Sequence, residues 1–239
     1  MKLELKKFIK IPGKDFHPVL RLFLVFLPVA LLICGGGYLY YLSQLRFIHE
    51  QNRKMEHETV QVGVVSINRS LEYVMQDVQV LYSNTDFRTM LDHPGKTNVD
   101  CVAADWIAFA EAKQAYQKIR WIDERGVERL RVNYADDRAY VVPEEKLLDR
   151  KGRYFFEDTN ALKEGEMYVS PLDLNIENDR IEEPFVPTIR FGMPVFNSKG
   201  QKRGILLLNY YADTMLTRFE QLTGIRGNAA WLVNRDGYW

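Results

Sequence analysis

The stretch PTIRFGMPVFNSKGQKRGILLLNYY, residues 187–211, decides the fold. Two apolar runs, 187–196 and 203–211, flank the turn residues Asn197-Ser198-Lys199-Gly200, which is the pattern of a β-hairpin. The run Ile205-Leu206-Leu207-Leu208 is entirely apolar, as expected for a central strand covered on both faces. We therefore predict a strong antiparallel hairpin within an α/β domain of the α+β kind.

A second hairpin is predicted upstream, where apolar residues recur with a period of two. Its strands are 118–123 and 127–134, and the turn 124–126 joins them. The other elements predicted for this domain are a helix at about 99–117, a short helix near 155–162, a short strand at 167–170, a polar loop at 171–184 and a helix at 212–222.

Residues 43–92 contain one glycine and no proline, so we predict one long stalk helix that ends before Pro94. Apolar residues recur along it at alternating spacings of four and three, which is a heptad stripe. The stripe consists of Val60, Val64, Ile67, Leu71, Val74, Val78 and Leu81. It can dock on the chain's own globular domain or pair with a second copy, and the sequence leaves both possibilities open.

Residues 22–42 read LFLVFLPVALLICGGGYLYYL and carry no charge. A helix of this length rises about 1.5 Å per residue and spans roughly 30 Å, the hydrocarbon thickness of a bilayer. The alternative is a cleaved signal peptide, but its apolar region is only about 7–15 residues long. We therefore predict an uncleaved transmembrane helix. Six basic residues precede it and three follow within twenty residues, which places residues 1–21 in the cytoplasm.

The C-terminal end of the sequence predicts the start of another element. Residues 229–234 have the pattern of a strand, and Arg235-Asp236-Gly237 that of a hairpin turn. A strand without a partner leaves backbone groups unpaired. We therefore expect the chain to continue beyond residue 239 into a second, similar unit.

Composition and motifs exclude several functional classes. The sequence has 32 Lys and Arg against 32 Asp and Glu, so it lacks the basic excess of a nucleic-acid-binding protein. We find no nucleophile motif, phosphate-binding glycine loop or metal-ligand spacing, so no catalytic residue, metal or cofactor is predicted. Cys34 lies inside the apolar segment 22–42, whereas Cys101 lies far outside it, so we expect no disulfide between them. We expect both to be packing residues.

Three arginines lie inside strands that otherwise read as buried: Arg120, Arg131 and Arg190. An unpaired guanidinium in a core is costly, so each needs a carboxylate partner or a wet cavity. One interpretation is a ligand pocket on one sheet face, in which an anion meets the planar forks of the arginines. The predicted site residues are Arg120, Arg131, Tyr154, Tyr168, Ser170, Asp173 and Arg190. The other interpretation is a solvated face on which the arginines pair with Glu128 or Asp123.

Four stretches of the chain resemble Cache (PAS-like) sensor domains, and most closely the double-Cache ectodomains of bacterial diguanylate cyclases and histidine kinases. They are 119–133, 168–175, 188–206 and 230–239. The run Ser170-Pro171-Leu172-Asp173-Leu174-Asn175 is the most specific of them. Amino-acid-binding members of the family use an Arg-x-Trp-Tyr arrangement followed by a Tyr and an Asp, whereas this sequence has Arg120-Trp121-Ile122.

The resemblance implies an antiparallel PAS-like sheet and a division into segments. These are a cytoplasmic N-terminus (1–21), a transmembrane helix (22–42), a stalk (43–92), a membrane-distal Cache domain (93–223) and the start of a membrane-proximal one (224–239). It also implies a periplasmic sensor anchored in the bacterial inner membrane, with its output enzyme beyond residue 239. The chain itself is expected not to be an enzyme.

The sequence therefore predicts a receptor region that binds a small anion, for example a carboxylate, and that acts as a homodimer. The competing hypothesis is an envelope module that binds a protein and has no small-molecule ligand. It predicts exposed apolar surface on the sheet instead of a buried cationic pocket.

Overall fold

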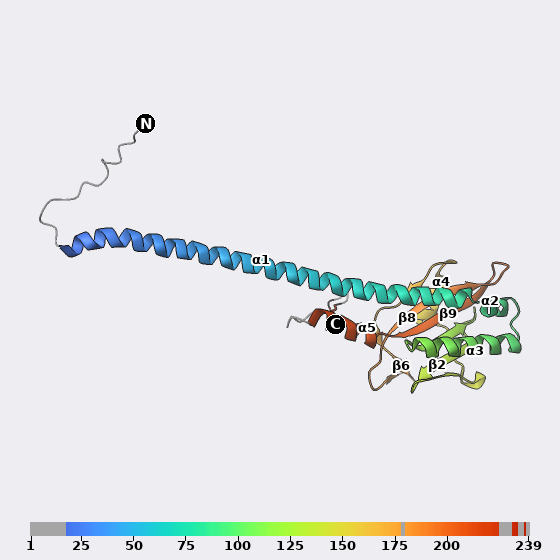
Figure 1. The fold of residues 1–239 in the computed structure, drawn as a ribbon. Helices are drawn as coiled ribbons and strands as arrows, with labels where there is room; N and C mark the ends of the chain where they lie inside the picture. The colour runs from blue at the N-terminus through green and yellow to red at the C-terminus, as the bar shows by residue number, and fades with distance from the viewer. Residues whose placement is uncertain (1–17, 178–179, 225–230, 234–236, 238–239) are drawn as a thin grey trace. The chain divides into compact units, whose positions relative to one another are not determined.

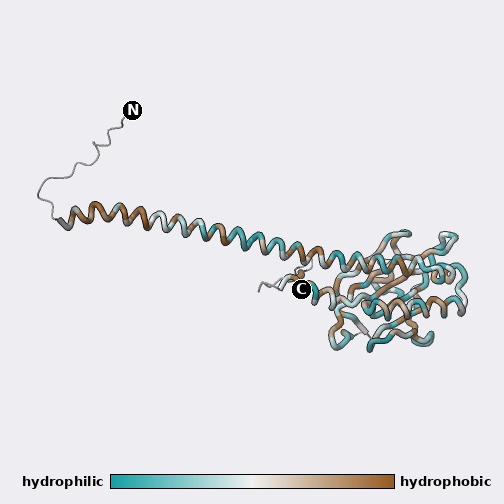
Figure 2. Tube along the Cα trace, viewed as in Figure 1, coloured by the Kyte–Doolittle hydropathy of each residue, from teal (hydrophilic) through white to brown (hydrophobic). Residues whose placement is uncertain are grey.

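The computed structural model describes residues 18–177, 180–224, 231–233 and 237. The chain divides into two compact units, residues 1–58 and 59–239. In the first unit, helix α1 (Pro18–Ser83) begins and carries the predicted apolar segment, which Figure 2 shows as a run of hydrophobic residues. A window of this helix has a mean hydropathy of 2.3, with none of it buried, so α1 is long and apolar enough to cross a membrane.

The second unit consists of helices packed around a main antiparallel sheet of seven strands (Figure 1). The sheet order is β3-β2-β1-β9-β8-β4, and β5 also pairs with β8. The strands are β1 (Tyr116–Ile122), β2 (Glu128–Ala135), β3 (Arg138–Val141), β4 (Tyr168–Val169), β5 (Asp173–Leu174), β8 (Pro187–Phe196) and β9 (Lys202–Tyr211). The two predicted hairpins are thus β1–β2 and β8–β9, and the apolar strand β9 lies at the centre of the sheet.

Alternate strand residues point to one face of the sheet, which is lined mainly by aliphatic and aromatic side chains. Ile119 on β1, Phe191 on β8 and Leu208 on β9 belong to this face and are completely buried. The second half of α1 covers it together with α2 (Thr85–Asp92) and α3 (Lys96–Lys113). This packing is the main hydrophobic core of the unit.

The opposite face holds a much smaller apolar cluster and most of the buried charge. Ile122, Ile205 and Leu207 pack there against Phe155 and Phe156 of helix α4 (Tyr154–Ala161). Helix α4 lies very close to strand β8 at Gly192, where an added Cβ atom would collide with the side chain of Thr159 on α4. The remaining elements of the unit are η2 (Glu144–Lys146), the two-stranded pair β6 (Ile176–Glu177) and β7 (Arg180–Ile181), and α5 (Asp213–Gly224).

The heptad stripe of the stalk docks on the chain's own domain in its second half. Val74, Val78 and Leu81 are buried, whereas Val60 and Val64 are exposed. The expectation of one helix through residue 92 is wrong, because Asn84 interrupts it. Its side chain accepts a hydrogen bond from the N–H of Phe87 and so caps the new helix α2.

Other boundaries also differ from expectation. The helix predicted to end at 117 ends at Lys113, because Gln114 adopts a left-handed conformation and β1 begins at Tyr116. Strand β3 and the short strands within 171–184 were missed. Half of the predicted strand at 229–234 lies outside the described residues, and its described half, 231–233, is not in a strand. Both cysteines are free, as expected, but both are exposed, so the expectation that they are packing residues is wrong.

Candidate ligand-binding site

The candidate site lies on the face of the sheet that α4 covers, where adjacent strands present polar side chains in two rows. In the first row, Asn209 of β9 is paired with Lys118 of β1 on one side and with Arg190 of β8 on the other. In the second row, Arg120 of β1 is paired with Arg131 of β2. Neighbouring strands are about 4.8 Å apart, so all these groups share one small area of the sheet.

Glu128 gathers three arginines at one end of this area. Its carboxylate lies 2.9 Å from Arg131 Nη1 and 2.8 Å from Arg150 Nε, and its Oε1 atom lies 3.6 Å from Arg120 Nη1. The backbone N–H of Leu148 also donates to it, at 3.2 Å. Burial alone would raise the pKa of Glu128, but the three guanidinium groups outweigh this effect and the pKa is lowered. Glu128 is therefore a buried anion at neutral pH.

Arg120 is 3% exposed and links the two rows. Its Nη2 atom donates to Asn209 Oδ1 at 2.5 Å, while its Nε atom has no hydrogen-bond partner among the described residues. Burial lowers the pKa of Arg120 to about 9, and Glu128 opposes that shift. The guanidinium thus stays charged at neutral pH, and its Nε–H donor is unused among the described residues.

Arg190 organises a second cluster from three different elements. Its Nη1 atom donates to Asp173 Oδ1 on β5 and to Tyr154 Oη on α4, each at 2.8 Å. Tyr154 in turn donates to Asp173 Oδ2 at 2.9 Å. Burial raises the pKa of Tyr154 to about 12, so its hydroxyl remains a donor. The Ser170 hydroxyl accepts the backbone N–H of Arg190 at 2.8 Å and fixes the strand beneath the guanidinium.

An aromatic ring separates the two clusters. The Phe155 ring of α4 lies 5.2 Å from Arg120 Cζ and 5.7 Å from Arg190 Cζ, within reach of a cation–π interaction with each. Tyr168 packs against the same apolar cluster. α4 therefore covers the cationic face with an aromatic side chain and with the Tyr154 hydroxyl.

The structure brings together four of the seven predicted residues, namely Tyr154, Ser170, Asp173 and Arg190. Arg120 lies near them through Asn209, while Arg131 belongs to the Glu128 cluster. Of the two carboxylates expected as partners, Glu128 pairs with Arg120 and Arg131, whereas Asp123 pairs with Arg129 at 2.7 Å. The ion pairs of the second interpretation are thus present at Arg120 and Arg131, although Arg120 is buried and not solvated.

Sequence reasoning missed several members of the site. Asn209, Asn175, Arg150, Phe155 and Lys118 all face it, and their role depends on long-range pairing. The sequence did contain a signal for Lys118 and Asn209. Both are polar residues within buried strands, and this was the pattern that drew attention to the three arginines. The described part of the chain contains no group of three or more residues that could hold a metal ion.

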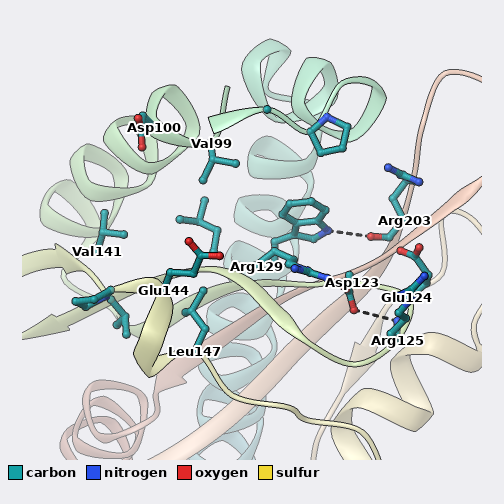
Figure 3. A pocket seen from close by; sticks show the side chains of 16 residues that line it. Val99, Asp100, Asp123, Glu124, Arg125, Arg129, Val141, Glu144, Leu147 and Arg203 are labelled. Atoms are coloured by element: carbon teal, nitrogen blue, oxygen red, sulfur yellow. Dashed lines mark hydrogen bonds and ion pairs between the residues drawn. The ribbon is translucent and has the colours of Figure 1, made fainter. Parts of the chain in front are cut away.

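A separate cavity of about 770 Å³ lies near the other side of the β1–β2 hairpin (Figure 3). Trp121 forms part of its wall and donates its indole N–H to Arg203 O at 2.9 Å. Figure 3 shows Glu144 and Leu147 on one side of the cavity and Asp123 on another. None of the seven predicted site residues lines it, so this cavity is distinct from the candidate site.

Comparison with known proteins agrees with this fold. Residues 64–239, more than half of the chain, match the family model of the bacterial histidine kinase sensor domain. A domain from Vibrio parahaemolyticus assigned to the sensory box/GGDEF family aligns with a TM-score of 0.63 at 19% identity, covering 70% of this chain and 63% of that one. The extracellular domain of vpHK1S-Z8, assigned as a histidine kinase, gives the same TM-score and identity over 70% of this chain and 60% of that one.

A chemoreceptor domain is also similar. The ligand-binding domain of Campylobacter jejuni Tlp3 in complex with L-valine aligns with a TM-score of 0.56 at 12% identity, covering 72% of this chain and 65% of that one. The chain thus spans less than two thirds of the length of these structures. No curated protein shows significant similarity to it.

The sequence-based resemblance to Cache-type sensor domains is confirmed by the fold, with its antiparallel sheet, its long N-terminal helix and its flanking helices. At these identities the solved structures establish the fold alone. The family match extends over the whole described sheet and over α1 from residue 64 to its end. The chain therefore belongs to the family of bacterial histidine kinase sensor domains.

Proposed function

We propose that this chain is the ligand-sensing region of a membrane-anchored bacterial receptor and that it binds a small carboxylate at Arg190, on the face beneath α4. The observation that carries this proposal is the convergence of Arg190, Tyr154 and Asp173 from β8, α4 and β5. Arg190 is only 5% exposed, and its guanidinium has the planar geometry that matches a carboxylate. A structural ion pair alone would not require a tyrosine hydroxyl bound to both partners.

The arrangement suits a ligand that carries a carboxylate, either alone or together with an ammonium group. Arg190 and Arg120 supply guanidinium donors, and Asp173, which is 40% exposed at its side chain, supplies an acceptor. The Tlp3 domain is described in complex with L-valine, which has both groups. An amino acid would place its carboxylate at the arginines and its ammonium at Asp173. A simple organic acid would use the arginines only.

The receptor role rests on α1. This helix includes the candidate membrane segment and continues into the core of the sensor unit, where Val78 is completely buried. A continuous helix transmits a displacement, whereas a flexible linker would absorb it. The excess of basic residues before the span favours a cytoplasmic N-terminus and a periplasmic sensor. The output module, a histidine kinase or a diguanylate cyclase, would lie beyond residue 239, and this region would not itself be an enzyme.

A thermal-shift screen tests the ligand site. The full chain in detergent micelles is heated with organic acids, amino acids and phosphates, and we expect carboxylates to raise Tm. The variant Arg190→Ala removes the response, because the carboxylate loses its principal donor. The matched control is Arg138→Ala, which removes an exposed arginine on β3 and leaves the response intact. A carboxylate response that persists in Arg190→Ala would refute this site.

A further inference from the structure

The cavity beside the β1–β2 hairpin has the size of a small-molecule site. Its volume of about 770 Å³ lies within the roughly 300–1,000 Å³ typical of pockets that hold drug-sized ligands. It lies on the side of the sheet that α2 and α3 cover, because Trp121 and Leu130 in its wall belong to the main hydrophobic core. Arg190 contacts Tyr154 of α4 on the opposite side of the sheet. A ligand in this cavity is therefore separate from a ligand at Arg190.

Much of the cavity wall is apolar. Trp121 is 5% exposed, and its indole N–H already donates to Arg203 O at 2.9 Å, so the ring offers apolar surface and no free donor. The wall also contains aliphatic side chains that are buried or half-buried, those of Val99, Leu130, Val142 and Leu147. An apolar group that enters this space leaves water and gains free energy in proportion to the area that it buries.

Two pairs of charged residues in the wall balance each other. Asp123 forms an ion pair with Arg129 at 2.7 Å, and the backbone N–H groups of Arg125 and Val127 also donate to its carboxylate. Glu124 and Arg125 follow one another in the exposed turn and carry opposite charges. The other charged residues of the wall are Asp100, Glu144 and Arg203.

These remaining charges are of opposite sign and lie on different elements. Asp100 on α3 and Glu144 on η2 are exposed carboxylates, and neither forms an ion pair with a residue that the structure describes. Arg203 on β9 is half-buried, and its Nε atom donates to Leu91 O at 3.2 Å. It has no carboxylate partner in the described part of the chain either. Figure 3 shows Asp100 and Glu144 apart from Arg203, so a ligand with one cationic and one anionic end can meet both signs.

We propose that this cavity is a second binding site of the sensor unit and that it takes a short peptide with apolar side chains and free ends. The ammonium group of the peptide lies towards Glu144 and Asp100, and its carboxylate binds the guanidinium of Arg203. The planar guanidinium matches a carboxylate and gives charge-assisted hydrogen bonds. The apolar side chains of the peptide pack on Trp121 and Leu130. A purely apolar molecule would leave both charges unmet, and a simple organic acid would meet Arg203 alone.

The first experiment uses Trp121 as a reporter of occupancy. The full chain, which has four tryptophans, is labelled with 5-fluorotryptophan and placed in lipid nanodiscs, so that no detergent enters the cavity. Trp121→Phe identifies the ¹⁹F signal by its loss. We expect L-leucyl-L-leucine to shift this signal saturably in the wild type and equally in Arg190→Ala. A missing shift would overturn this inference and leave the proposed function standing, whereas a shift that disappears in Arg190→Ala would assign the peptide to the Arg190 site instead.

The second experiment tests the two charged ends with capped peptides. N-acetyl-leucyl-leucine lacks the ammonium group and leucyl-leucine amide lacks the carboxylate, so each should bind the wild type about tenfold more weakly. Acetylation should no longer matter in Asp100→Asn with Glu144→Gln, and amidation should no longer matter in Arg203→Gln. Arg203→Lys keeps the positive charge and should retain the effect of amidation, which separates a lost contact from a disturbed fold. The controls Glu145→Gln and Arg138→Gln change exposed residues outside the cavity and should retain both effects. Equal affinity of the wild type for free and capped peptides would overturn this inference.

Discussion

At the scale of single residues, the cationic face depends on Glu128. This carboxylate is 1% exposed, and Arg131, Arg150 and Arg120 approach it from β2, from the loop before α4 and from β1. Without it, several guanidinium groups would be buried with no counter-charge on that side. Glu128 is thus a structural partner that leaves part of the donor capacity of Arg120 available for a ligand.

Replacing Glu128 by Gln is expected to destabilise the sensor unit strongly. The amide keeps the shape of the side chain but leaves three arginines without their anion, and breaking a buried ion network costs about 3–5 kcal/mol. Urea unfolding of the full chain at pH 7 measures the loss. The control is Glu124→Gln, which neutralises an exposed carboxylate in the neighbouring turn and should change stability by less than about 0.5 kcal/mol.

The difference between the wild type and Glu128→Gln should shrink in acid. The pKa of Glu128 is lowered in the folded state, so its contribution is fully present above the unfolded value of about 4.3 and is lost as pH falls through the folded value. Unfolding free energies measured at pH 7, 5, 4 and 3 should therefore converge below about pH 4. A difference that stays constant from pH 7 to 3 would show that Glu128 does not act as a buried anion.

At the scale of secondary structure, the hairpins could be predicted because their signals are local. The turn Asn197–Gly200 and the apolar runs on either side of it specify β8 and β9 without any knowledge of the rest of the chain. Asn84 was different, because a polar residue can lie on an exposed helix surface or cap a new helix. Its Nδ2 atom donates to Asp105 on α3 at 2.9 Å, so a long-range contact decides between the two.

The candidate site could be predicted only in part for the same reason. Arginines in buried strands signalled that charge is buried, and Arg190, Tyr154 and Asp173 do meet. Which arginine pairs with which carboxylate depends on strand register and on the position of α4, and neither can be read from one strand. The role of Asn209 follows from its place between β1 and β8.

The contact between α1 and α5 provides a test at this scale. A Cβ atom at Gly63 would lie 2.7 Å from Phe219 Cε2 and 3.1 Å from Thr223 Cγ2, so α5 packs directly on the helix backbone. Gly63→Val should force the helices apart and cost about 1–3 kcal/mol, measured as a lower Tm of the full chain. Gln61→Val places the same side chain at an exposed position of α1 and controls for its effect on the helix. Equal Tm values for the two variants would contradict this packing.

At the scale of the whole molecule, the two halves of the heptad stripe behave differently. Val74 and Val78 are buried in the sensor core, so this half holds α1 against the sheet. Val60 is 54% exposed and Val64 is 45% exposed, although both continue the same stripe. One helix can therefore dock on its own domain along one segment and present an apolar seam to a second copy along another, which would allow the homodimer that the sequence predicts.

If the seam pairs two copies, charging it should separate them without unfolding either one. We expect the full chain in detergent to be a dimer by light scattering, and Val60→Glu with Val64→Glu to be a monomer, because two facing pairs of carboxylates repel in a coiled-coil interface. Tm, extrapolated to low protein concentration, should be unchanged, since neither side chain contributes to the sensor core. Val80→Glu is the control, because Val80 is 59% exposed on α1 but lies outside the stripe. A wild-type monomer, or a control that also dissociates, would exclude this seam as the dimer contact and leave its valines as single exposed apolar residues.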